Sequence, residues 1–189
     1  SLNCNDFENR GTLSFTGALD VTNNASFVSY FTNEGTVTVN NNATFSDTFT
    51  NKRNFSITGN ATFSGAVTNN GTITCGSGAL VMEGNYSGSG ELTLSSGTST
   101  FNGGTVNFSG TELIHNGGTI IFGMFSNYGE VALTVNNTVF NNVQIGTNDK
   151  TVKITVDGNF TVAGDFSASN PNRFSKYLSN TIALLSYIF

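Results

Sequence analysis

The sequence carries little charge, and this excludes several classes of function. Only 10% of its 189 residues are charged, whereas about 25% are charged in a typical soluble chain. Its seven Lys and Arg residues are scattered, so the chain lacks the basic patch of a nucleic-acid-binding protein. No apolar run reaches the ~18 residues that a membrane helix needs. We therefore expect no nucleic-acid partner and no membrane span.

Groups suited to catalysis or metal binding are also scarce. His115 is the only histidine, so a Ser-His-Asp or Cys-His scheme would depend on it, and a solvated strand-end histidine is the favoured interpretation. Two cysteines and one histidine do not make a zinc site. The acidic residues form no close pair on adjacent turns in the register given below, although a long-range pair such as Asp157 with Asp165 stays open. Because glycoside cleavage needs two facing carboxylates, we expect no enzyme and no cofactor.

Tryptophan is absent and proline occurs once, whereas phenylalanine occurs 17 times. Phenylalanine has no polar atom that needs a partner, so it suits a dry, narrow core. A single proline argues against a long disordered linker. A surface rich in Asn, Thr, Ser and Gly is typical of a secreted or cell-surface protein. The chain begins at Ser1 rather than at methionine, which is typical of a processed or trimmed segment.

A repeated motif predicts the architecture. The motif is Phe-x-Asn-x-Gly-x-apolar-x-apolar, or a close variant of it, and its copies begin at Phe7, Phe31, Phe49, Val67 and Phe125. Between positions 31 and 75 the spacing of the copies is constant. A fixed period of about 18 residues, with alternating apolar residues inside it, is the signature of a solenoid of stacked β-coils.

Alignment of the first four copies gives six inward-facing columns. Column one aligns Phe7 with Phe31, which makes residues 22–28 an insertion. The last two columns end at Ala79 and Val81. Inward pairs recur six residues apart, so each turn should contain three short strands and have a roughly triangular cross-section. Glycines at the corners, such as those at positions 11, 35 and 71, are expected to adopt left-handed backbone.

The predicted fold is therefore an all-β, single parallel β-helix of about nine or ten turns. It should occupy residues 1–170, with regular turns over 7–81, degenerate turns over 85–122 and recovered turns over 125–166. The glycines in the degenerate part, Gly104 and Gly118, are closer together in the sequence than one regular period, which predicts shorter turns or tighter corners there.

The asparagine of the motif should sit at a corner and bond to its neighbours above and below, as in cross-β ladders. We expect this structural role rather than ligand binding. The predicted ladder contains Asn9, Asn33, Asn51, Asn69 and Asn127.

The two cysteines are expected to remain unpaired. Cys4 precedes the first turn and Cys75 lies in the fourth, about 14 Å away at ~4.8 Å per turn. A disulfide needs Cα atoms within about 7 Å. Cys75 falls in register with Val39 and Ile57, so we interpret it as a small buried apolar residue.

The tail over residues 171–189 lacks the Asn/Gly corners and is richer in apolar residues. It is interpreted as a cap on the last turn or as a segment that docks on a neighbouring subunit, because an open β-helix end exposes unpaired backbone. The candidate docking residues are Ile182, Leu184, Leu185, Tyr187 and Phe189.

The motif Asn-x-Gly-x-apolar-x-apolar, followed by a second apolar pair, resembles the repeats of filamentous-haemagglutinin-like and autotransporter-passenger β-helices. Residues 7–21, 31–45 and 67–81 carry the resemblance best, and residues 125–166 carry it more loosely. The resemblance implies a right-handed, surface-exposed coil that works in adhesion, in aggregation or as a stalk. The strand pairs six residues apart also resemble left-handed hexapeptide helices, so the handedness comes from the resemblance alone.

Three functions follow as hypotheses. The first is an extracellular structural protein, either an adhesin stalk or a filament subunit that self-associates end to end and possesses a surface for host or environmental glycans. The second is a carbohydrate-binding or carbohydrate-active β-helix. The third is an ice-binding solenoid, suggested by outward pairs such as Thr36/Thr38 and Thr72/Thr74, although Asn54/Ser56 interrupts this array.

Overall fold

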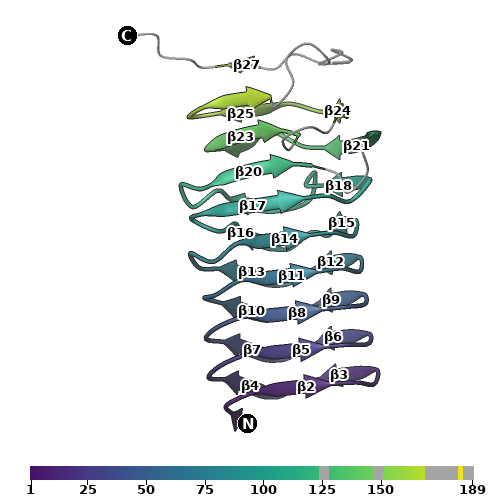
Figure 1. Cartoon of the computed structure of the whole chain (residues 1–189), viewed down its shortest axis with the longest axis vertical. Coiled ribbons are helices and arrows are strands. Elements are labelled where there is room, and N and C mark those ends of the chain that lie inside the picture. The colour runs from purple at the N-terminus through teal and green to yellow at the C-terminus, as the bar shows by residue number, and fades with distance from the viewer. Residues whose placement is uncertain (124–127, 147–150, 169–182, 185–189) are drawn as a thin grey trace.

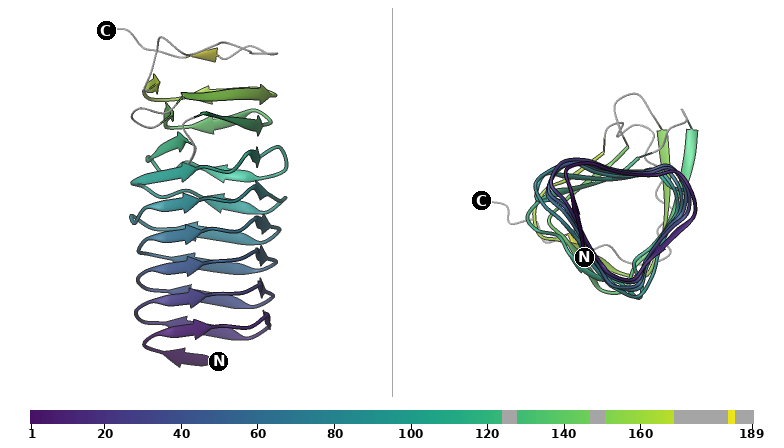
Figure 2. Two further views of the ribbon diagram at one scale, coloured as in Figure 1. Left: turned by 45° about the vertical axis from the view of Figure 1, so that its right-hand side comes forward. Right: turned by 90° about the horizontal axis from the view of Figure 1, so that it is seen from below.

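The chain winds into a stack of turns, each built from three short strands. The computed structural model describes residues 1–123, 128–146, 151–168 and 183–184. The regular structure of these residues is entirely β, and neighbouring strands are parallel. The turns rise along one axis from the N-terminus (Figure 1), and viewed along that axis they share a triangular outline (Figure 2). The predicted all-β solenoid with three strands per turn is confirmed.

Within the described residues the strands form three long sheets and one short sheet. Sheet A contains β1 (Leu2–Cys4), β4 (Ala18–Val21), β7 (Thr36–Val39), β10 (Asn54–Ile57), β13 (Thr72–Cys75), β16 (Glu91–Thr93) and β19 (Glu112–Ile114). Sheet B contains β2 (Phe7–Asn9), β5 (Ala25–Phe27), β8 (Ala43–Phe45), β11 (Ala61–Phe63), β14 (Leu80–Met82), β17 (Thr98–Phe101), β20 (Thr119–Phe122), β23 (Asn142–Ile145) and β26 (Phe166–Ala168).

Sheet C contains β3 (Leu13–Phe15), β6 (Phe31–Asn33), β9 (Phe49–Asn51), β12 (Val67–Asn69), β15 (Tyr86–Ser87), β18 (Thr105–Asn107), β21 (Tyr128–Thr134) and β24 (Thr151–Asp157). The short sheet D contains β22 (Thr138–Phe140), β25 (Phe160–Val162) and β27 (Ala183–Leu184).

Apolar and polar residues alternate along the strands, so that apolar side chains face the core and polar ones face solvent. In β7 the side chains of Val37 and Val39 are buried, whereas Thr36 faces solvent. β-Branched residues suit both faces of such a pleated, half-buried strand. Corners rich in Gly, Asn and Ser end most strands after three or four residues, because these residues accommodate turns.

Stacked aromatic rings form the centre of the core. Phe27, Phe45 and Phe63 lie above one another on sheet B, with ring centroids 4.5 and 4.4 Å apart. Phe31 and Phe49 form a second stack on sheet C. These spacings are close to the ~4.8 Å between strands, so each turn adds a similar contact to the one below it. The core is one cluster that runs along the coil.

The first copy of the motif is out of register with the prediction. Sequence alignment paired Phe7 with Phe31, but β2 pairs with β5, so Phe7 lies beside Ala25, and Leu13 lies beside Phe31. Residues 22–28, interpreted as an insertion, contain the regular strand β5. The three strands of a turn share one alternation, so the motif can slip by a whole strand without disturbing the pattern.

A second correction concerns the last two columns. Ala79 and Val81 were predicted to face inward, but the residues in register with Ala61 and Phe63 are Leu80 and Met82, which are buried. The corner before β14 is one residue longer than the corresponding corner one turn below. A shift of one residue moves every side chain of a strand to its other face.

The turns within residues 85–122 are longer than the regular turns, not shorter as predicted. Gly104 precedes β18 of sheet C and Gly118 precedes β20 of sheet B. The two glycines therefore lie on different faces of the coil, and the number of residues between them is not the length of a turn. The turn that separates the in-register partners Glu91 and Glu112 is longer than the turn that separates Asn33 from Asn51.

The lengthening also reduces the number of turns. Asn51 follows Asn33 by 18 residues, whereas Asp165 follows Asn142 by 23. The described coil therefore has about eight turns rather than the nine or ten obtained by assuming a constant period. The right-handed sense of the coil stays a prediction, favoured by the general preference of parallel crossover connections.

Both cysteines are free. Cys75 is buried beside Ile57, in the column that contains Val39, as predicted. Burial raises the pKa of its thiol to about 12, so the thiolate is rare at neutral pH. Cys4 lies beside Val21 at the other end of the same column.

The predicted tail, residues 171–189, is described only at β27, which pairs with β25 and so lies on the last turn (Figure 1). Leu184 belongs to β27. The other candidate docking residues lie outside the described residues: Ile182, Leu185, Tyr187 and Phe189. The role of the tail as a cap or a docking segment stays a prediction. The described residues contain no helix long and apolar enough to cross a membrane.

Candidate functional site

Three buried asparagines form a ladder at the corner between sheets C and A. Asn33, Asn51 and Asn69 end successive strands of sheet C in register, and none has exposed surface. The Nδ2 of Asn33 donates to Oδ1 of Asn51 at 2.8 Å, and the Nδ2 of Asn51 donates to Oδ1 of Asn69 at 2.9 Å. Buried amides require such partners, and in-register stacking supplies them turn after turn.

The ladder also bonds to the main chain of the corner. The Nδ2 of Asn51 donates to the carbonyl oxygens of Arg53, at 2.8 Å, and Thr72, at 3.0 Å. The Oδ1 of Asn33 accepts a hydrogen bond from the Gly35 amide at 3.0 Å. The side-chain amides are therefore occupied by the protein itself, which supports a structural role for them.

Two residues expected in the ladder are not part of it as described. Asn9 lies on β2 in register with Phe27 of sheet B, and its Nδ2 donates to the carbonyl oxygen of Gly11 at 2.6 Å. Asn127 lies outside the described residues. The ladder ends at Asn69, because the chain above it is Gly88, where any Cβ would overlap the Asn69 carbonyl.

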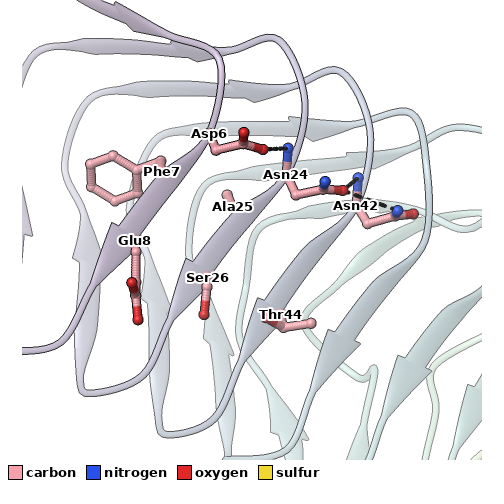
Figure 3. A pocket seen from close by; sticks show the side chains of 8 residues that line it. All are labelled: Asp6, Phe7, Glu8, Asn24, Ala25, Ser26, Asn42 and Thr44. Carbon is pink, nitrogen blue, oxygen red and sulfur yellow. Dashed lines mark hydrogen bonds between the residues drawn. The ribbon is translucent and has the colours of Figure 1, made fainter.

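A second row of polar side chains, which sequence reasoning missed, runs outside the corner before sheet B. Asp6, Asn24, Asn42 and Asn60 lie one above another, and each side-chain Oδ1 accepts the main-chain N–H of the next turn. Figure 3 shows the first three of them. The donor–acceptor distances are 3.1, 3.3, 2.9 and 2.8 Å. The signal in the sequence is the 18-residue spacing of these side chains. We call this set the outer row.

The outer row borders a pocket on the first turns of sheet B, where Glu8, Ser26 and Thr44 form a parallel line (Figure 3). Both of its carboxylates have partners: Asp6 accepts from Asn24, and Glu8 pairs with Arg10 at 2.8 Å. The pocket therefore contains no free set of convergent charged groups. Its lining residues are Asp6, Phe7, Glu8, Asn24, Ala25, Ser26, Asn42 and Thr44.

The outward face of sheet A presents hydroxyl groups in register. Thr36, Asn54 and Thr72 form one column. The parallel column contains Thr38 and Ser56, whose hydroxyls are 3.4 Å apart. Asn54 interrupts the threonines, as the sequence indicated, and ice binding by this face stays a prediction.

The same face carries a carboxylate pair that the predicted register excluded. Glu91 and Glu112 are in-register partners on β16 and β19, so adjacent turns present two carboxylates side by side. Adjacent strands are about 4.8 Å apart. No ion pair to either glutamate occurs in the described part of the chain. The prediction of no close acidic pair was wrong, because it assumed the regular period where the turn from Glu91 to Glu112 is longer.

The groups needed for nucleophilic or metal chemistry do not converge. His115 lies beyond the end of β19, and its Nδ1 accepts the Gly117 amide at 3.0 Å. Cys75 is buried in the core. No group of three or more His, Cys, Asp or Glu side chains suited to a metal ion occurs within the described ranges.

The chain was also compared with known proteins. No family model, no curated protein and no solved structure matches its sequence. Similarity therefore assigns neither a family nor an activity to the chain, and function has to be argued from the geometry described above.

Proposed function

We propose that the chain is a structural and interaction protein, an extracellular β-solenoid that serves as an adhesin stalk or as a filament subunit assembled by end-to-end stacking. The observation that carries this proposal is the single core, which continues from turn to turn along the described coil. Parallel pairing between turns, the buried ladder and the phenylalanine stacks all repeat along one axis, which favours a stiff rod.

The first turn supports assembly through its open strand edges. Among the strands that the structure describes, β1, β2 and β3 each lie at the edge of a sheet and have one neighbour. The first turn's inward side chains are incompletely covered, as at Phe7, Leu13 and Phe15. Unpaired edges over apolar side chains invite a further strand. The first partner that we propose is therefore another copy of the same chain.

The faces of the rod support a role outside the cell. They are covered by hydroxyl and amide side chains with few charges, and such groups hydrogen-bond readily to sugars. Glycans of a host or of the environment are the second class of partner that we propose.

Assembly is tested by light scattering of the purified chain over a concentration series, with negative-stain microscopy of the same samples. We expect unbranched fibres one coil wide whose length increases with concentration. A monodisperse rod of 19.9 kDa at every concentration would overturn the filament role.

A carbohydrate-binding β-helix is the second candidate, favoured by the pair Glu91 and Glu112 on the hydroxyl-bearing face of sheet A. Carboxylates accept hydrogen bonds from sugar hydroxyls more strongly than neutral groups do. The double variant Glu91→Gln/Glu112→Gln should lose about thirtyfold or more in affinity for any glycan found by an array screen, since each charge-assisted bond contributes roughly 1.5–3 kcal/mol and the neutral bond that replaces it only about 0.5–1.5 kcal/mol. Unchanged affinity in the double variant would count against this site, and Glu34→Gln, at a carboxylate away from the pair, serves as the control.

A further inference from the structure

We propose that Asn116 is a site of spontaneous covalent modification, at which the Gly117 amide nitrogen attacks the Asn116 side chain with His115 as the general base. The reaction converts the asparagine, through a succinimide, into aspartate or isoaspartate. It acts on the chain itself and is independent of the proposed assembly and of glycan binding.

The corner between β19 and β20 places the reacting groups side by side. The Nδ1 of His115 accepts the Gly117 amide at 3.0 Å, and a neutral imidazole has one such acceptor nitrogen. The Gly118 amide bonds to the His115 carbonyl at 3.1 Å, and the two residues between them have positive φ, 50° at Asn116 and 75° at Gly117. Asn and Gly tolerate such backbone in a tight turn. The turn therefore holds the imidazole against the proton that the reaction must remove.

The nucleophile and its target are accessible. Asn116 and Gly117 are both exposed, and a Cβ on Gly117 would have nothing within 4 Å, so no neighbouring group crowds the attacking nitrogen. The Nδ2 of Asn116 donates to the Leu94 carbonyl at 3.3 Å, which is longer than the usual N–H···O limit of about 3.2 Å. Turning the side chain toward the Gly117 nitrogen gives up this weak hydrogen bond.

The chemistry needs water as its single co-reactant. His115 Nδ1 removes the proton from the Gly117 nitrogen as that nitrogen forms a bond to Cγ of Asn116. The imidazolium returns the proton to Nδ2, the Cγ–Nδ2 bond breaks and ammonia leaves, so a succinimide ring and a neutral imidazole remain.

Water then opens the ring by breaking one of its two carbon–nitrogen bonds to Gly117. Attack at Cγ gives aspartate, whereas attack at the main-chain carbonyl gives isoaspartate, in which the main chain runs through Cγ. Either product adds one negative charge to an exposed corner of the coil.

The other two Asn-Gly pairs of the chain, Asn70-Gly71 and Asn102-Gly103, have no such base in place. The Gly71 amide donates to Oδ1 of Asn69 at 3.3 Å, and a carboxamide oxygen is a hydrogen-bond acceptor but a very weak base. Gly103 is buried against the main chain of the turn below. These two pairs are therefore reference sites within the same molecule.

The first experiment compares the three pairs in the native chain. The purified chain is incubated at neutral pH, and peptide mapping by mass spectrometry measures aspartate and isoaspartate at each site. We expect conversion at Asn116 to be at least about tenfold faster than at Asn70 or Asn102, since a positioned general base contributes about 10²–10⁴-fold while hydroxide acts on all three. Hydroxylamine should trap the succinimide at Asn116. Equal rates at the three sites would overturn the proposal.

The second experiment removes the base. His115→Ala should slow conversion at Asn116 about tenfold or more, and added imidazole should restore part of the rate, which a histidine with a purely structural role would not show. Asn141→Ala is the matched control, because the Nδ2 of Asn141 donates to the Gly117 carbonyl at 2.6 Å. It loosens the same corner but keeps the base, so conversion should be as fast as in the native chain or faster.

Three results would each overturn the role of His115. They are conversion that is unchanged or faster in His115→Ala, a failure of imidazole to restore the rate, and equal slowing in Asn141→Ala. Circular dichroism of both variants shows that the coil is folded in each comparison.

Discussion

Replacing Asn51 with leucine is expected to lower the free energy of unfolding by roughly 4 kcal/mol, because buried polar groups left without partners cost about 1–3 kcal/mol each. Leucine has a similar size but no donor. The carbonyl oxygens of Arg53 and Thr72 would lose a hydrogen bond that the Asn51 amide supplies, and the Asn33 and Asn69 side chains would lose their contact through the ladder.

The matched control is Asn54→Ala, at an exposed asparagine on sheet A, just past the corner that holds the ladder. Exposed substitutions usually change stability by less than about 0.5 kcal/mol. Urea denaturation of both variants gives the two free energies. Equal urea midpoints for Asn51→Leu and Asn54→Ala would show that the ladder does not stabilise the coil.

The second large effect is expected at Gly71. A Cβ there would overlap the main-chain oxygen and nitrogen of Arg53, one turn below. Backbone cannot move aside as a flexible side chain does, so Gly71→Ala should cost roughly 3 kcal/mol. The glycine is required by this close approach and not, as predicted, by left-handed backbone, because its φ is not positive.

Gly11 provides the contrast. It occupies the equivalent place in the sequence motif, but a Cβ on it would have nothing within 4 Å. Gly11→Ala should therefore leave stability unchanged or raise it by about 0.4–1 kcal/mol, since alanine restricts the unfolded chain. Thermal unfolding of the two variants measures the difference, and similar melting temperatures would contradict the packing of the turns described here.

The fold could be predicted from the sequence in the part of the coil where every turn has the same number of residues. Between Asn33 and Asn69 each turn has 18 residues, so sequence columns and structural columns coincide. In the later turns the corners lengthen, so the alternation persists but the predicted register is lost. In the earlier turns the period of 18 residues still holds, but the motif was assigned to the wrong strand. The alternation is the same on all three faces, so nothing in it distinguishes Phe7 on sheet B from Phe31 on sheet C.

The rest of the register depends on the number of residues in each corner, which the alternation of apolar and polar residues does not reveal. One additional corner residue moved Leu80 rather than Ala79 into the core. A turn longer than the regular one brought Glu91 beside Glu112. The outer row, in contrast, could have been found, because Asn24, Asn42 and Asn60 keep the 18-residue spacing.

Function could be argued less far than fold, for a physical reason. The chemistry of a solenoid of this kind is spread over repeated main-chain and hydroxyl groups, whereas catalytic motifs are recognised by a few reactive side chains. His115, the sole histidine, accepts a hydrogen bond from the nearby Gly117 amide, and Cys75 is buried in the core. What distinguishes one such coil from another is its ends and faces.

Fibre diffraction from concentrated, aligned samples of the native chain tests the central claim most directly. A rod of stacked parallel turns joined end to end predicts a strong meridional reflection at about 4.8 Å along the fibre axis, with an axial repeat of roughly 40 Å for each chain. Samples that neither align nor show that reflection, and that contain only single short rods, would contradict the account.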